Sequence, residues 1–237
     1  MGMINYFTFD GVSSRDFGVF ISGTTVFNAA PRSIQTVAVP GRSGTLTLDN
    51  GRFENVDLTY PAFIYDQFHE NVEGLRNYLL SAAGYRRLED TYNPDTYMMA
   101  RYVSGLSVET TQIRKQGRFD LTFDRMPQRF LKAGEDPVEF TTAGSITNPT
   151  RFASKPLIRV YGTGTLGIGS ETITITQNPG YIDIDSEMMD AYYGATNCND
   201  YITLSSGEFP VLEPGSNGVN PGTGITRVII TPRWWIL

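Results

Sequence analysis

Acidic side chains gather in the second half of the chain, and their types suit metal binding or acid–base chemistry. Asp183 and Asp185 alternate with two isoleucines, and Glu187 and Asp190 follow closely. The alternation predicts a strand with both aspartates on one face, which we expect to be the solvated face. A calcium loop is not favoured, because Met188 stands where such a loop requires glycine. As a hydrolase pair, the two aspartates would need a cleft and an identifiable acid, and the sequence reveals neither.

Other residue types that serve in catalysis are scarce. His69 is the only histidine and Cys198 the only cysteine of the 237 residues. A catalytic triad could use only His69, and no G-x-S-x-G motif supplies a nucleophile. One histidine and one cysteine cannot assemble a zinc site or an intrachain disulfide. We therefore expect neither an enzyme nor a metal or other cofactor.

A glycine-rich segment imitates a nucleotide-binding motif. Residues 162–167 read GTGTLG and match G-x-G-x-x-G. That motif requires a helix directly afterwards, because the helix N-terminus holds the phosphates. Residues 171–176 (ETITIT) alternate strictly instead, and this pattern predicts a strand. The glycines are therefore interpreted as a hairpin loop.

Aromatic side chains are the remaining candidates for binding. Alternation along residues 228–235 points Trp234 toward a core and Trp235 outward. An outward tryptophan either lies on the surface, packs on another chain or stacks on a ligand. Tyr192 and Tyr193 are adjacent aromatics that could also stack on a sugar. These three residues are the candidate partner or glycan contacts.

Charge and apolar runs exclude two classes of partner. The chain has 19 basic and 25 acidic residues, a net charge of −6, and no run of like charges longer than Arg86-Arg87. No basic stripe could follow phosphates, so sequence-specific nucleic-acid binding is not expected. The longest apolar runs, such as residues 17–21, fall short of the roughly 20 residues of a membrane span, and membrane insertion is not expected. The N-terminus lacks the pattern of a signal peptide.

Strand patterns dominate the first half of the chain, and one helix interrupts them. Apolar residues recur every three or four positions within residues 66–83, which predicts one amphipathic helix. Residues 34–48 alternate weakly around the turn PGRSG at 40–44, which predicts a hairpin. Residues 109–115 are polar and are interpreted as an exposed arm.

The second half reads as an all-β domain. Residues 132–156 are poor in large apolar side chains and rich in turn residues, which is typical of a linker. We therefore predict two domains, 1–138 and 139–237. Turn residues separate the predicted short strands, a spacing that suits a β-sandwich. These strands are residues 157–161, 172–176, 181–185, 201–204, 209–212 and 225–230.

Several segments, taken in order, resemble a known family. They are FTFDGVSSRDFGV (7–19), VPGRSG (39–44), GRFEN (51–55), YRRL (85–88), FDRMPQRFL (123–131), FPVLEPGSN (209–217) and PRW (232–234). Together these segments are similar to the distal tail proteins of phages with long, non-contractile tails. The resemblance spans nearly the whole chain, and it depends on the order and spacing of the segments rather than on any one of them.

The resemblance implies a mainly β fold with a structural function. It implies an N-terminal β-rich domain with one helix that assembles into a homo-hexameric ring, followed by a C-terminal galectin-like β-sandwich. Such a ring joins the tail tube protein to the tail tip or a tail-associated lysin protein, lets DNA pass, and carries out no catalysis. The expected location is the virion tail, after synthesis in the cytoplasm of the bacterial host. We expect subunit contacts from the N-terminal sheet and from residues 109–115.

Two alternatives to the tail hub remain open. The first is a glycan-binding module that stacks sugars on Trp235, Tyr192 or Tyr193. The second is a tail-associated hydrolase that uses Asp183 or Asp185.

Overall fold

The structure is a computed structural model that describes residues 4–22, 28–64, 67–105, 109–111 and 116–237. Its contacts divide the chain into two compact units, Met1–Arg129 with Leu237, and Phe130–Ile236. The sequence predicts a boundary between residues 138 and 139, whereas this division falls earlier. The difference arises because Leu131 packs against the core of the second unit.

The first unit is built on an antiparallel sheet with one helix. Along the sheet the order of strands is β2-β1-β7-β8-β10-β6-β3, and β9 pairs with β10. The strands are β1 (Phe7–Phe9), β2 (Val12–Ser13), β3 (Val19–Ile21), β6 (Val56–Ile64), β7 (Arg86–Asp90), β8 (Thr96–Tyr102), β9 (Glu109–Thr111) and β10 (Gln116–Leu131). A short 3-10 helix, η1 (Ser14–Phe17), lies between β2 and β3. Of the predicted arm, residues 112–115 lie outside the described residues.

Period-two patterning explains how these strands bury one face. Phe7 and Phe9 of β1 are buried on either side of the half-buried Thr8. The predicted helix is confirmed as α1 (Phe68–Ser81), whose buried residues face the same core. The buried residues of α1 are Phe68, Val72, Leu75 and Leu79. Because both elements present apolar stripes of the correct period, they close one continuous core.

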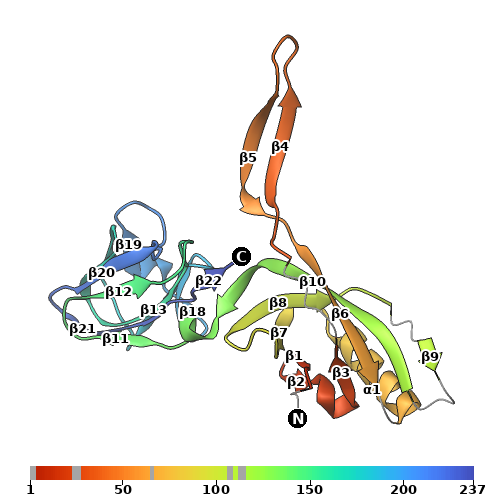
Figure 1. Cartoon of the computed structure of the whole chain (residues 1–237). Coiled ribbons are helices and arrows are strands. Elements are labelled where there is room, and N and C mark those ends of the chain that lie inside the picture. Colours follow the sequence, from red (N-terminus) through yellow and green to blue (C-terminus); the bar gives the residue numbers. More distant parts are fainter. Residues whose placement is uncertain (1–3, 23–27, 65–66, 106–108, 112–115) are drawn as a thin grey trace. The chain divides into compact units, whose positions relative to one another are not determined.

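Two strands of the first unit form a sheet of their own. β4 (Arg32–Ala38) and β5 (Thr45–Phe53) pair only with each other among the described strands, and Figure 1 shows them as a separate two-stranded ribbon. The predicted hairpin is thus confirmed. Nearly all of its residues are exposed.

The second unit is a β-sandwich of two sheets around one core. The six-stranded sheet has the order β11-β21-β13-β16-β17-β18, and the five-stranded sheet has the order β12-β20-β14-β15-β19. Buried residues from both sheets form a single apolar cluster. The mainly β fold, with one α-helix among the described residues, is therefore confirmed, while the galectin-like detail stays a prediction.

The strands of this unit are short. They are β11 (Val138–Phe140), β12 (Gly144–Asn148), β13 (Leu157–Gly162), β14 (Gly164–Ile168), β15 (Glu171–Ile175), β16 (Ile182–Asp185), β17 (Asp190–Tyr193), β18 (Thr196–Asn197), β19 (Ile202–Leu204), β20 (Gly215–Pro221), β21 (Ile225–Thr231) and β22 (Trp235–Ile236). Two 3-10 helices, η2 (Lys132–Gly134) and η3 (Asn199–Tyr201), complete the unit. The strand predicted at residues 209–212 is wrong: only Leu212 makes a bridge, to Ser154. Pro210 lacks the N–H group that a strand ladder needs there.

Candidate interaction surfaces

The two aspartates of the acidic cluster are buried, which corrects the prediction of a solvated face. Asp183 accepts hydrogen bonds from Nε and Nη2 of Arg159 at 2.7 and 2.8 Å. Asp185 accepts from Nη1 and Nη2 of Arg233 at 2.7 and 2.8 Å. Burial opposes the ionisation of Asp185, but the bonds from Arg233 and the Met188 N–H outweigh it and lower the pKa of this carboxyl. Each arginine thus occupies both carboxylate oxygens of its aspartate. Because neither carboxylate has an oxygen free of an arginine, the pairs do not favour a cation site or a hydrolase.

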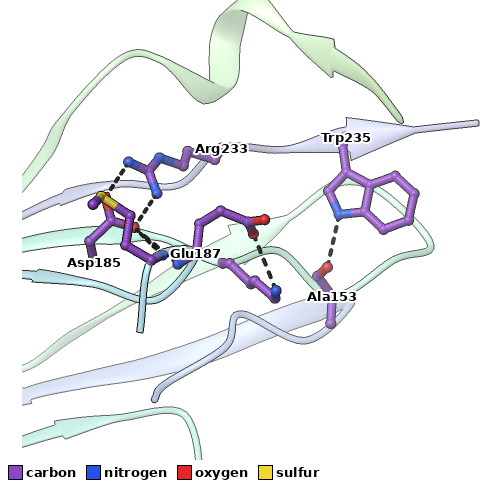
Figure 2. A network of polar contacts seen from close by, with 7 residues as sticks. Ala153, Asp185, Glu187, Arg233 and Trp235 are labelled. Carbon is purple, nitrogen blue, oxygen red and sulfur yellow. Dashed lines mark hydrogen bonds and ion pairs between the residues drawn. The ribbon is translucent and has the colours of Figure 1, made fainter. Parts of the chain in front are cut away.

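Asp185 also holds the turn between β16 and β17 in place. Its Oδ1 accepts the backbone N–H groups of Glu187 and Met188 at 3.0 and 3.2 Å. Glu187 in turn pairs with Lys155 at 3.3 Å, and Figure 2 shows this network beside Arg233. The turn therefore presents the side chains of Met188 and Met189, which are 65% and 67% exposed, from a backbone held at several points.

Met189 has a φ of 52°, in the left-handed region that side chains other than Asn, Asp and Gly seldom adopt. We expect Met189→Asn to raise the free energy of unfolding by about 0.5 to 1 kcal/mol, because asparagine tolerates this region better. Thermal unfolding of the two proteins checks this. The matched control is Met188→Asn, which changes the neighbouring exposed side chain without a positive φ and should not stabilise the protein. An unchanged or lower stability of Met189→Asn would contradict the expectation.

The three aromatic candidates do not come together as one site. The Trp235 ring stacks on Phe152 with centroids 4.4 Å apart, and its Nε1 donates to the carbonyl oxygen of Ala153 at 2.9 Å. Figure 2 shows that this bond directs the indole into its own unit. Tyr192 is half-buried, and no described contact joins Trp235 to Tyr192 or Tyr193. Trp235 is thus largely committed to contacts within the chain.

Tyr193 belongs to a different aromatic group, which the sequence analysis missed. Its ring meets Tyr181 edge-on at 4.7 Å, and Tyr181 lies 6.1 Å from Tyr161. The guanidinium groups of Arg159 and Arg227 stack over Tyr181 and Tyr161 at 4.2 and 4.0 Å. Arg159 and Tyr161 are two residues apart on β13 and therefore share a face. That spacing is the one feature of the sequence that indicates this aromatic group.

The lone histidine and cysteine carry no visible chemistry. His69 is exposed on α1, where its ring lies edge-on to Phe68 at 5.7 Å. Cys198 is buried, and its thiol donates to the carbonyl oxygen of Thr196 at 3.5 Å. In the part of the chain that the structure describes, no group of three or more His, Cys, Asp or Glu side chains could hold a metal ion. No helix in that part is long and apolar enough to cross a membrane.

The glycine-rich segment is neither a phosphate loop nor the predicted hairpin loop, because it leads from β13 of one sheet into β14 of the other. Gly162 and Gly164 join β13 to β14 at positive φ angles of 98° and 136°. A Cβ atom at Gly162 would overlap the carbonyl oxygen of Gly224, and one at Gly164 would overlap that of Thr223. The glycines are therefore required because two chain segments approach closely, and the predicted absence of a following helix is confirmed by β14 and β15.

We expect Gly162→Ala to lower the free energy of unfolding of the second unit by about 2 to 4 kcal/mol, through a strained φ and a backbone clash. Gly167→Ala is the matched control, since its new Cβ would meet only ordinary contacts, the nearest at 3.5 Å. Denaturant unfolding of both variants checks the difference. Equal stabilities would show that the segment does not need glycine.

The β4–β5 hairpin is amphipathic although no described segment covers it. Val37 pairs with Leu46, and Leu48 pairs with Gln35, so these apolar side chains share one face. Val37, Leu46 and Leu48 are 38%, 42% and 47% exposed. The opposite face carries Thr36, Thr45 and Thr47, together with Ile34, Ala38 and Asp49. An isolated two-stranded hairpin is marginally stable in water, so an exposed apolar stripe on one indicates contact with another protein surface.

A hollow of about 540 Å³ lies on the first unit beside β1, η1 and β3. It is lined by Tyr6, Thr8, Gly11, Ser13, Arg15, Asp16 and Phe20. The Arg15 guanidinium stacks over the Tyr6 ring at 5.1 Å, and Phe20 stacks on Phe63 at 5.9 Å. No described hydrogen bond or ion pair engages the exposed carboxylate of Asp16. The hollow therefore combines aromatic walls with one arginine, which stacks on Tyr6, and one carboxylate that forms no ion pair among the described residues.

Comparison with known proteins identifies the fold. No protein-family model and no curated protein matches the sequence. A crystal structure of the SPP1 Dit protein, described as a paradigm of the hub adsorption apparatus in phages that infect Gram-positive bacteria, matches with a TM-score of 0.77. That match has 12% identity and covers 99% of this chain and 100% of the other.

Two structures of the phage P2 baseplate in its activated conformation also match. The one with Ca has a TM-score of 0.52 and 10% identity, covering 96% of this chain and 97% of the other. The one with Sr has a TM-score of 0.50 and 10% identity, covering 96% and 98%. The predicted resemblance to distal tail proteins is therefore confirmed at the level of the fold, over both units.

Proposed function

We propose that this chain is a distal tail protein of a phage: a structural hub, without catalysis, between the tail tube and the tail tip or baseplate. The observation that carries the proposal is the fold match to a hub protein over 99% of this chain and 100% of the other. A match over both units, in one order along the chain, is stronger support than a match to a single sandwich. Fold alone does not determine function, so the surfaces of the chain supply the second argument.

Those surfaces favour assembly over catalysis. The buried aspartates are paired with arginines, and the candidate Trp235 is bonded within its own unit. The hairpin, in contrast, exposes an apolar face that a free monomer would leave in water. We infer that this face contacts another copy, and that six copies form the ring. A contact between two different surfaces of identical chains generates a ring when its rotation closes.

Position in the virion follows from this proposal. The ring would lie at the distal end of the tail tube, contact the tube protein and the tip or tail-associated lysin, and let DNA through its centre. A net charge of −6 is compatible with that passage, since an acidic protein does not hold phosphates. The chain would be made in the cytoplasm of the bacterial host.

Immunogold labelling of intact virions tests the location. Antibody against the purified chain should label the distal end of the tail, where the tube meets the tip. Label at the head, along the whole tube or on no part of the virion would overturn the proposal. Antibody pre-absorbed with the purified chain is the control for specificity.

A further inference from the structure

We propose that the turn at the end of the β4–β5 hairpin of one copy docks into the hollow between Tyr6 and Phe20 of a second copy, where Arg42 pairs with Asp16. This inference deepens the proposed function, because it names the two surfaces that join neighbouring copies. The inference rests on three features. They are a preformed cationic turn, an aromatic hollow with one unpaired carboxylate, and a hairpin whose base lies at the other end of β6 from that hollow.

The turn at the end of the hairpin has a defined shape. Pro40 and Gly41 occupy its centre, Gly41 has a φ of 79°, and the Arg42 N–H donates to the carbonyl oxygen of Val39 at 3.2 Å. These features match a type II turn, in which proline sets the first angle and glycine allows the second. Arg42 follows directly, and no described contact engages its side chain. A preformed turn loses less conformational entropy when it docks.

The hollow complements this turn in two respects. Tyr6 and Phe20 provide half-buried aromatic walls against which Val39 and Pro40 can pack. Asp16 provides a carboxylate without a partner among the described residues. The other charge in the hollow is Arg15, whose guanidinium is already stacked over Tyr6 at 5.1 Å. Asp16 is therefore the group in the hollow available for Arg42.

The hairpin and the hollow of one chain lie at different ends of β6. The hairpin enters β6 at Val56, which pairs with Arg125, while Phe63 at the other end pairs with Phe20 beside the hollow. Seven residues of strand separate these positions by about 23 Å. The hairpin side chains are exposed along both strands, so the hairpin does not fold back over the sheet. The hairpin of the same chain therefore does not fill the hollow, which leaves it open to the hairpin of a neighbour.

Disulfide trapping between two variants tests the contact directly. One protein carries Arg42→Cys and the other Asp16→Cys, so a bond between residues 42 and 16 can form only between two chains. The native Cys198 is 1% exposed and should not react. The control mixture replaces Asp16→Cys by Asp95→Cys, which changes an exposed aspartate outside the hollow. On mild oxidation, we expect the Arg42→Cys and Asp16→Cys mixture to give at least five times more heterodimer than this control mixture. A yield no higher than this control overturns the proposal.

Charge reversal separates a specific pair from chance proximity. We expect Asp16→Arg and Arg42→Asp each to raise the concentration at which copies associate about tenfold, because like charges then face each other. The combined variant should return to within threefold of the unaltered protein. If the combined variant loses association by the sum of the two single losses in free energy, the pairing of Arg42 with Asp16 is overturned.

The outcomes distinguish this inference from the proposed function. Rings without the 16–42 bond overturn the docking alone and leave the hub intact. The 16–42 bond without rings supports the docking and contradicts the hexamer. Neither rings nor the bond, at any concentration tested, overturns both.

Discussion

Replacing Val37, Leu46 and Leu48 together by threonine is expected to convert an assembled ring into folded monomers. Each side chain is at least 38% exposed in the single chain, so removing its apolar atoms costs the monomer little. Burying such a side chain contributes about 1.5 kcal/mol or more. Because each of them is already more than half buried in the single chain, a contact gains less than half of the full value per side chain, about 2 to 3 kcal/mol for the three together. This corresponds to about thirtyfold to a hundredfold in the association constant. Threonine retains the strand propensity of the hairpin.

Sedimentation velocity across a concentration series measures this loss of assembly, and thermal unfolding shows that each unit stays folded. The matched control replaces Thr36, Thr45 and Thr47 of the opposite face by serine, a change of the same number of residues on the same strands. That control should assemble as the unaltered protein does. Rings that persist in the apolar-face variant would show that this face is not a contact between copies.

The second large effect concerns the buried ion pair of the second unit. Arg233→Met leaves the Asp185 carboxylate, whose side chain is 4% exposed, without its two-pronged partner. Breaking a buried pair costs 3 to 5 kcal/mol when both groups are fully buried. Because the Arg233 side chain is 28% exposed, we expect a loss of about 2 to 3 kcal/mol and a fall in melting temperature of about 10 °C. Differential scanning calorimetry measures both quantities.

The loss should depend on pH with a defined sign. The pKa of Asp185 is lowered in the folded protein, so its ionised form stabilises the fold above the unfolded pKa of about 4. That contribution disappears as the pH falls through the folded pKa. The stability difference between Arg233→Met and the unaltered protein should therefore be largest at neutral pH and shrink below pH 4. Arg227→Met, which removes an arginine stacked on Tyr161 at 4.0 Å, is the control and should cost under 1 kcal/mol. A pH-independent difference would contradict the assignment.

Local patterns of the sequence predict most of the elements. The three-to-four spacing within residues 66–83 marks α1, and strict alternation marks β15, because each pattern reports one buried face. The turn-rich composition of residues 132–156 predicts a linker, yet this segment contains β11 and β12. Both are edge strands whose small and polar residues bury few apolar side chains, and such strands leave almost no periodic signal.

The contacts that decide function were harder to predict, because they join residues far apart in the chain. Arg159 and Asp183 pair across neighbouring strands, and the sequence does not indicate that the half-exposed arginine covers the aspartate and buries it. For the β4–β5 hairpin, the sequence suggests burial where the structure shows exposure. Its weak alternation resembles that of a strand with one buried face, and only the structure shows that both faces are exposed.

The absolute mass of the purified protein in solution tests the central claim most directly. Light scattering across a concentration series, with negative-stain images of the main species, should give about 158 kDa, six times the chain mass of 26.3 kDa, and rings with a central hole. Dimers with twofold symmetry at every concentration would contradict the hub, because a twofold contact uses the same patch on both copies and closes without a passage for DNA.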